Sequence, residues 1–153
     1  MNMIRKNGGF TLVELIVVIA ILAILAGVAV PAYSGYINSA NEAADITACD
    51  AIKTAAMAAL ATEGEVTKIV ITSGDSGSVS VNYSGSDTAV NLAAASPAAG
   101  TSAADFQTFY TSGIPTFKTQ VTGASGKTTA TKATWDNTSA AGANQGKWVF
   151  SAG

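Results

Sequence analysis

The sequence predicts an α+β fold in which one long N-terminal helix packs against a C-terminal antiparallel β-sheet. Apolar residues run almost without interruption over residues 10–30, and a three- and four-residue periodicity typical of a helix continues to about residue 62. Farther on, β-branched stretches are separated by turns rich in glycine and serine. Strands that follow a helix in this way favour an antiparallel sheet that covers one face of the helix.

The first half of the predicted helix is apolar on all sides. Within residues 10–30 only Thr11 and Glu14 are neither apolar nor small. A helix of about 21 residues is about 31 Å long, close to the hydrocarbon thickness of a bilayer. Arg5 and Lys6 precede it and favour a cytoplasmic N-terminus. The sequence therefore predicts a membrane span that carries one carboxylate.

Three interpretations of this segment differ in the role they give to Glu14. A secretory signal peptide would be cut near Val30-Pro31-Ala32, but its apolar region would be too long and would contain a charge. A plain anchor leaves Glu14 unexplained, because a charge at the centre of a spanning helix costs about 2.5–3.5 kcal/mol on insertion scales. A cut between Gly9 and Phe10 explains it. The new α-amino group would lie one helical turn from Glu14, and a buried charge pair is tolerated where a single charge is not.

The residues around this junction resemble a known processing signal. About residues 1–35 resemble the class III signal of type IV pilins and pseudopilins. The residues that carry the resemblance are Lys6, Gly8-Gly9, Phe10-Thr11-Leu12-Val13-Glu14-Leu15 and Pro31. The resemblance implies cleavage after Gly9 by prepilin peptidase and N-methylation of Phe10. It also implies that apolar helices pack into a filament core, where Glu14 pairs with the terminal amine of a neighbouring subunit.

Two further positions take a meaning from the same resemblance. It implies that the helix loosens around Gly27 and Pro31 during assembly, and proline and glycine do weaken helices. The alternative is that Pro31 simply breaks the helix where the anchor leaves the membrane. The residues alone do not decide between the two.

The second half of the helix is predicted to be amphipathic. Two apolar stripes recur at helical spacing, and polar side chains fill the other side. We expect the helix to end near Glu63, with Gly64 as its C-cap. The first stripe is Tyr33, Tyr36, Ile37, Ala40 and Ala44; the second is Ile46, Cys49, Ile52, Lys53, Ala56 and Leu60; the polar side is Asn41, Glu42, Asp45, Asp50 and Thr54.

Five strands and a short helix are predicted beyond residue 64. The strands are 66–72, 78–83, 116–122, 128–135 and 147–150, with turns at 74–77 and 123–126. A helix at 103–110 would lay Phe106, Phe109 and Tyr110 on the sheet edge. Trp135, Trp148 and Phe150 are interpreted as core or sheet-face residues, because aromatic side chains in strands usually pack. Pilin heads resemble this plan, a long helix followed by a variable loop and a sheet.

The predicted organisation has four parts. Residues 1–9 form a leader that is removed, 10–32 a transmembrane and filament-core helix, 33–63 its amphipathic half, and 64–153 a globular head with a loop and an antiparallel sheet. Many pilins close the C-terminal region with a disulfide, but Cys49 is the only cysteine, so this chain cannot. In that respect it is similar to disulfide-free major pilins of Gram-positive bacteria. Sheet hydrogen bonds and aromatic packing must then hold residues 116–153.

The composition argues against catalysis. The chain has no histidine, the commonest general base and metal ligand, and Cys49 lies on an apolar stripe as a buried small residue would. No spacing typical of a metal or cofactor site occurs, so we expect no enzyme, no cofactor and no metal. The net charge of −2, with no basic stripe, gives no reason to expect nucleic acid as a partner.

The sequence thus favours a structural subunit of a type IV pilus, for adhesion or twitching motility. The resemblance implies identical subunits and prepilin peptidase as partners, with an assembly platform and its ATPase acting indirectly. It implies a single-pass precursor in the cytoplasmic membrane and later a fibre at the cell surface. The alternatives are a pseudopilin of a type II secretion or competence system, and a monomeric membrane-anchored adhesin.

Overall fold

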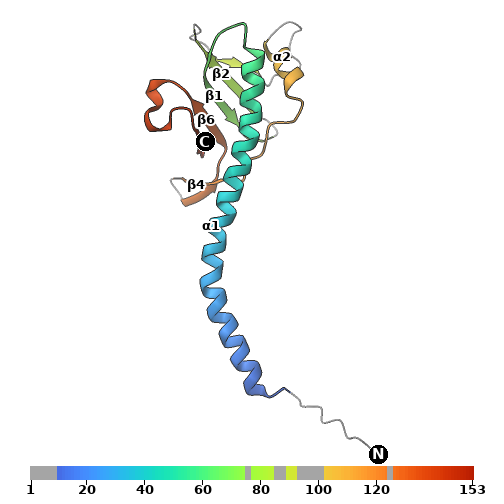
Figure 1. Ribbon diagram of the computed structural model, residues 1–153, viewed down its shortest axis with the longest axis vertical. Coiled ribbons are helices and arrows are strands. Elements are labelled where there is room, and N and C mark those ends of the chain that lie inside the picture. The colour runs from blue at the N-terminus through green and yellow to red at the C-terminus, as the bar shows by residue number, and fades with distance from the viewer. Residues whose placement is uncertain (1–9, 75–76, 85–88, 93–101, 124–125) are drawn as a thin grey trace, which may run out of the picture. The chain divides into compact units, whose positions relative to one another are not determined.

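The computed structural model describes residues 10–74, 77–84, 89–92, 102–123 and 126–153 (Figure 1). They form an α+β fold with one long N-terminal helix and an antiparallel sheet, as predicted. The chain divides into two compact units, Met1–Ile37 and Asn38–Gly153. The elements are α1 (Leu12–Ala59), β1 (Val66–Thr72), β2 (Ser78–Tyr83), β3 (Val90–Asn91), α2 (Ser102–Phe109), β4 (Gln120–Gly123), β5 (Gly126–Thr129), β6 (Lys132–Asp136), the 3₁₀ turn η1 (Ser139–Asn144) and β7 (Trp148–Ser151).

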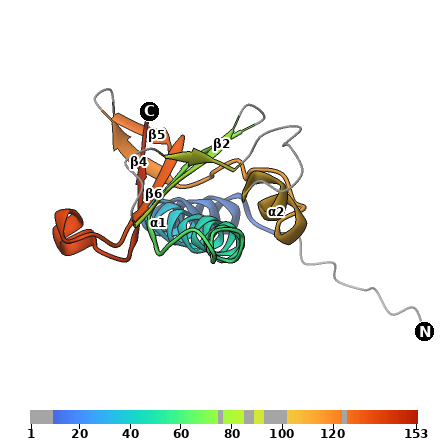
Figure 2. The ribbon, with the colours of Figure 1, turned by 90° about the horizontal axis from the view of Figure 1, so that it is seen from above.

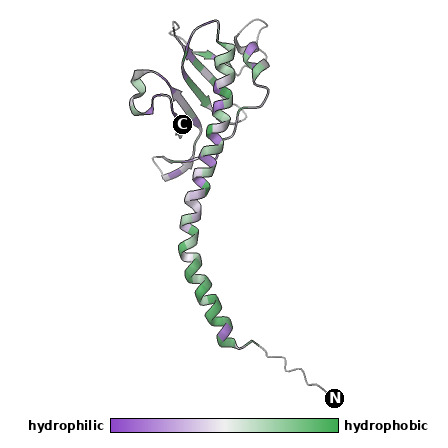
Figure 3. Ribbon diagram, in the orientation of Figure 1, coloured by the Kyte–Doolittle hydropathy of each residue, from purple (hydrophilic) through white to green (hydrophobic). Residues whose placement is uncertain are grey.

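In the first unit, the apolar side chains of α1 are exposed. Figure 3 shows the first half of this helix as almost uniformly hydrophobic. Leu12 is 73% exposed and Ile24 is 71% exposed, and none of the most apolar window of the helix is buried. By length and composition α1 is long and apolar enough to cross a membrane. An apolar surface that is exposed among the described residues of its unit needs a lipid or protein environment.

Pro31 lies inside α1 and does not end it. The alternative that Pro31 simply breaks the helix is therefore wrong. Its physical effect is local, because proline has no N–H to donate to the carbonyl four residues earlier, which here belongs to Gly27. Gly27 and Pro31 are thus the two ends of one missing helical hydrogen bond. Loosening at this point during assembly stays a prediction.

The second unit is built on a five-stranded antiparallel sheet of order β3-β2-β1-β6-β7. β1 and β2 match their predicted bounds, and they pair through the expected hairpin. β4 and β5 form a separate two-stranded sheet. The part of α1 from Asn38 onward lies along one face of the larger sheet (Figure 2).

The predicted strands 116–122 and 128–135 are wrong in their bounds. The first forms strand only from Gln120, and the second is two strands, β5 and β6. The chain changes partner between them: the N–H of Ala130 donates to the carbonyl of Thr119, whereas that of Thr131 donates to Ser151. Composition does not encode this change, because the residues on both sides of it are equally strand-like.

The core lies between the sheet and the second stripe of α1. Cys49, Ile52 and Leu60 are fully buried, as is Ile69 of β1. Trp135 is 5% exposed, and Trp148 and Phe150 pack partly buried against the same core, as predicted. The fully or nearly fully buried aliphatic partners from the strands and loops are Val66, Ile71, Val79, Val81, Leu92, Ala130 and Ala133.

Two expectations about packing are wrong. The first stripe of α1 is exposed: Tyr36 is 75% exposed and Ile37 43% exposed, and coverage of the helix begins only near Asp45. In α2, Phe106 is buried and stacks on Tyr110 at 5.6 Å between ring centroids, but Phe109 is 59% exposed. A short helix buries one face, and Phe109 lies off the face that Phe106 and Tyr110 share, at i and i+4.

Gly64 does not act as the predicted left-handed C-cap. It is absent from the glycines with positive φ, although its N–H donates to the carbonyl of Leu60 at 3.2 Å. What requires glycine is space: a Cβ there would lie 2.7 Å from the carbonyl oxygen of Ser84. Glycine is therefore required at residue 64 by the close approach of two chain segments.

Gly77, at the start of the β2 arm of the hairpin, gives a sharper test of the same effect. A Cβ on Gly77 would lie 2.5 Å from the carbonyl oxygen of Thr72 and 2.7 Å from Cγ2 of Ile114. We expect Gly77→Ala to destabilise the protein by about 1–3 kcal/mol, the usual cost of overpacking. Gly113→Ala is the matched control, because a Cβ there meets nothing within 4 Å. Equal urea midpoints for the two variants would contradict the steric account.

Candidate functional site

Glu14 is held by the residue that begins the helix. One oxygen of its carboxylate, Oε2, accepts hydrogen bonds from the N–H of Thr11 at 2.8 Å and from the hydroxyl of Thr11 at 2.9 Å. In return the N–H of Glu14 donates to Oγ1 of Thr11 at 3.3 Å. With α1 starting at Leu12, Thr11 is the N-cap and Glu14 the third helical residue, so the pair is a capping box.

The capping box was missed by the sequence analysis, although its signal is present. Thr11-Leu12-Val13-Glu14 fits the pattern of serine or threonine followed three residues later by an acidic residue. The box gives the carboxylate two donors within its own chain. It also satisfies helix N-terminal N–H groups that would otherwise face an apolar phase without partners.

The predicted partner of Glu14 is the amine of Phe10, which exists only after cleavage. In the uncut chain Phe10 carries a peptide N–H, and its side chain is 85% exposed. Gly9, the other residue of the predicted cleavage junction, lies outside the described residues. The charge pair and N-methylation of Phe10 therefore stay predictions. In the uncut chain, the N–H and hydroxyl of Thr11 are the groups that donate to the Glu14 carboxylate.

The predicted loosening site, Gly27 and Pro31, lies farther along the same exposed surface. A Cβ on Gly27 would meet nothing within 4 Å, so close packing within this chain does not require glycine there. The hydroxyl of Ser34 donates to the carbonyl of Pro31 at 2.8 Å. Such back-bonding within the helix is often associated with bending.

A second cluster fixes the segment that a disulfide cannot hold. Oδ2 of Asp45 accepts hydrogen bonds from the N–H of Lys118 at 2.8 Å, from the N–H of Thr119 at 2.8 Å and from the hydroxyl of Thr119 at 2.6 Å. About two helical turns earlier, Oδ1 of Asn38 accepts from the N–H of Gln120 at 2.8 Å. Two helix side chains thus tie down three consecutive peptide groups.

Asp45 was predicted on the polar side of the helix, and that is wrong, because it is only 5% exposed. The spacing held a signal: Asp45 lies four residues before Cys49, on the extension of the buried stripe. A buried carboxylate is tolerated when donors surround it. Asp45 therefore replaces part of the closure that we had assigned to sheet hydrogen bonds and aromatic packing alone.

The aromatic part of that closure is present as predicted. The indole N–H of Trp148 donates to Oδ1 of Asp50 at 2.9 Å, and the ammonium of Lys53 lies 4.9 Å from the ring centroid of Trp135. Trp135 and Trp148 face each other across β6 and β7. Phe117 also makes an edge-to-face contact with Phe150, with 5.3 Å between the ring centroids.

Cys49 is a packing residue. Its side chain is fully buried, and burial together with Asp45 and Asp50 raises the pKa of the thiol to about 12. A thiol with so high a pKa has almost no thiolate at neutral pH and is a poor nucleophile. Within the described ranges, no three or more His, Cys, Asp or Glu side chains gather in a way that could hold a metal ion.

Comparison with known proteins agrees with the N-terminal geometry. Residues 4–30 match the family model described as the prokaryotic N-terminal methylation motif. No curated protein and no solved structure matches the chain. The match confirms the processing signal inferred from the residues and supports a membrane-anchored precursor. It covers the apolar helix and leaves the second unit outside.

Proposed function

Because its N-terminal segment is that of a type IV pilin or pseudopilin, we propose that the chain is a structural subunit of a type IV pilus. The subunits would polymerise through α1 into an extracellular fibre for adhesion or twitching motility. The observation that carries the proposal is the exposed apolar helix α1, which begins with a capping box formed by Thr11 and Glu14. The motif indicates a structural protein.

The energetics favour assembly after processing. Once the leader is removed, the amine of Phe10 adds a positive charge next to Glu14, and pairing the two lowers the desolvation cost of each. When the helix leaves the bilayer, its apolar side chains would face water, and packing against other copies of α1 buries them. In this proposal Gly27 and Pro31 lie where the helix has already lost one hydrogen bond, so bending there costs least.

The partners follow from the same sequence of events. Prepilin peptidase acts first, the membrane holds the precursor, and identical subunits replace the lipid around α1. The assembly platform and its ATPase act indirectly, and we assign no binding site for them among the described residues. A pseudopilin of a secretion or competence system remains the second candidate, because the methylation motif marks pseudopilins as well. Electron microscopy of surface preparations separates a long surface fibre from a short envelope-bound one and from a monomeric anchor.

Cleavage can be tested at the junction. We expect Gly9→Leu to leave the full-length precursor in the membrane, visible as a heavier band on an immunoblot, because a peptidase at the membrane surface needs a small, extended segment. Gly35→Leu is the matched control, because a Cβ at Gly35 meets nothing within 4 Å and the residue lies far from the junction. Normal processing of Gly9→Leu would overturn the assignment of the signal. Phenylalanine, methylated at its nitrogen, is the expected first residue of the natural protein.

A further inference from the structure

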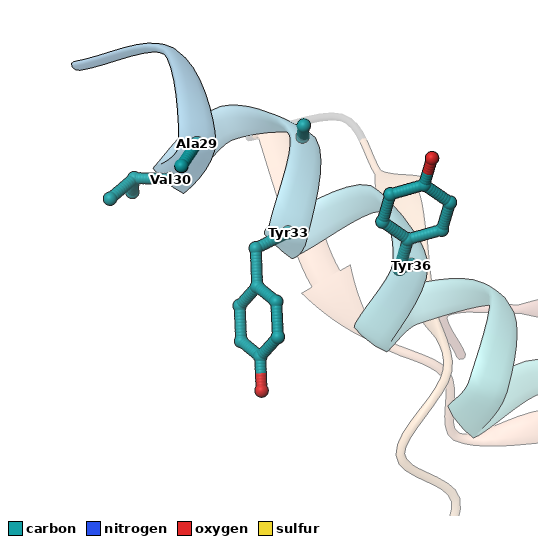
Figure 4. Close-up of a pocket in the computed structure, with 5 residues that line it drawn as sticks. Ala29, Val30, Tyr33 and Tyr36 are labelled. Carbon is teal, nitrogen blue, oxygen red and sulfur yellow. The ribbon is translucent and has the colours of Figure 1, made fainter. Parts of the chain in front are cut away.

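A shallow groove of about 470 Å³ lies on α1 within the first unit. It is lined by Ala29, Val30, Ala32, Tyr33 and Tyr36 (Figure 4). The two tyrosines are 67% and 75% exposed, and neither hydroxyl has a hydrogen-bond partner among the described residues. Figure 4 shows the rings extending away from the helix with their hydroxyls pointing in different directions.

The tyrosines lie where the apolar stretch ends. Residues 10–30 supply about 31 Å of apolar helix, the thickness of the hydrocarbon layer. Tyr33 and Tyr36 follow by about 4.5 and 9 Å along the axis, which is the depth of a headgroup layer. Beyond them the side chains become polar, starting with Asn38 and Ser39. No charged residue occurs between Glu14 and Glu42, so no lysine or arginine anchors this end of the span.

We propose that Tyr33 and Tyr36 anchor the unassembled subunit in the phospholipid headgroup layer at the outer surface of the membrane. The rings rest against acyl chains beside Val30, and the hydroxyls donate hydrogen bonds to ester and phosphate oxygens. Rings that point in different directions suit a lipid layer that surrounds the helix better than one partner helix on one side. The proposal rests on the membrane-anchored precursor and does not require that fibres form.

The anchor has a consequence for Glu14. Tyr33 lies 19 residues after Glu14, or about 28 Å along the helix axis. Holding Tyr33 in the outer headgroup layer therefore places the carboxylate near the inner edge of the hydrocarbon, where a charge costs less than at the centre. In this way the tyrosines set the depth of the Glu14 carboxylate in the bilayer before a neighbouring subunit binds.

The test measures depth in the full chain. Ser34, between the tyrosines, is changed to cysteine and labelled with a nitroxide in phosphatidylcholine vesicles; buried Cys49 does not compete for the label. Relative collision rates with oxygen and a water-soluble nickel complex give the label's depth. We expect the label in the headgroup layer. In Tyr33→Leu/Tyr36→Leu it should move inward by about 3 Å, the rise of two residues.

Two controls make the result specific. Tyr33→Trp/Tyr36→Trp keeps amphipathic aromatic rings and should leave the depth unchanged, and Phe109→Leu removes an exposed aromatic from the other unit with no effect. A label in bulk water or near the bilayer centre overturns the proposal, as does an unchanged depth in the double leucine variant. Spin–spin broadening from a neighbouring chain, with unchanged depth in that variant, assigns the groove to a second copy instead. The depth of the label in vesicles does not depend on whether the chain builds fibres in cells. Failure of the membrane anchor and failure of the proposed function are therefore distinguishable.

Discussion

Cells that carry Glu14→Gln should contain processed subunit in the membrane and few or no surface fibres. Glutamine keeps the size of the side chain and an oxygen that accepts from Thr11, so the capping box survives. What it removes is the negative charge. The amine of Phe10 then has no counterion in an apolar environment, and a single buried charge costs several kcal/mol. Immunoblots of membranes and fibre counts by electron microscopy measure the two parts of the outcome.

The capping contact makes a separable control possible. Thr11→Val removes the hydroxyl of the capping box but keeps the carboxylate, so we expect fibres to form in reduced number, because loss of an N-cap costs only about 0.5–2 kcal/mol. Glu14→Val removes both features and should behave like Glu14→Gln. Glu42→Gln changes an exposed glutamate of the same helix and should leave fibres unaffected. Abundant fibres from Glu14→Gln would count against the charge pair.

The sequence sufficed where local patterns decide the structure. The apolar run predicted the start of α1 to within two residues, and the helical periodicity predicted its end to within about four. β1 and β2 were predicted at their observed bounds, because β-branched residues and a glycine hairpin specify them locally. The N-terminal signal was recognised from residue types at fixed spacing. The capping box within this signal is equally local, because Thr11 and Glu14 have the spacing of the capping-box pattern, but it was not predicted.

The errors arise where contacts between segments distant in the sequence determine strand bounds or burial. Residues 128–135 were predicted as one strand, but the N–H groups of Ala130 and Thr131 donate to carbonyls of two different segments, and only the fold brings those segments close. Asp45 read as a surface residue because its type is polar, while its neighbours on the helix face are buried. A buried carboxylate is predictable from one sequence only if the segment that donates to it is known.

Of the changes proposed in the second unit, the replacement of Asp45 should have the largest effect on stability. Asp45→Ala leaves the N–H groups of Lys118 and Thr119 and the hydroxyl of Thr119 without their acceptor. Hydrogen bonds to a charged group contribute about 1.5–3 kcal/mol each, and buried donors without partners cost more than the bond itself. Since these bonds share one oxygen, we expect a total loss of about 3–5 kcal/mol. Urea unfolding of the detergent-solubilised chain, followed by the fluorescence of Trp135 and Trp148, measures it.

A graded series tests whether the carboxylate itself is responsible. Asp45→Asn keeps one oxygen that can accept but loses the charge, so its loss should be smaller, about 1–2 kcal/mol. Thr119→Val removes only the hydroxyl donor and should cost about 1 kcal/mol. Glu42→Ala, an exposed change on the same helix, should stay within about 0.5 kcal/mol of the parent. If Asp45→Ala costs no more than Glu42→Ala, residues 116–120 are held by the sheet and the aromatic contacts alone, and the non-covalent replacement of the disulfide is wrong.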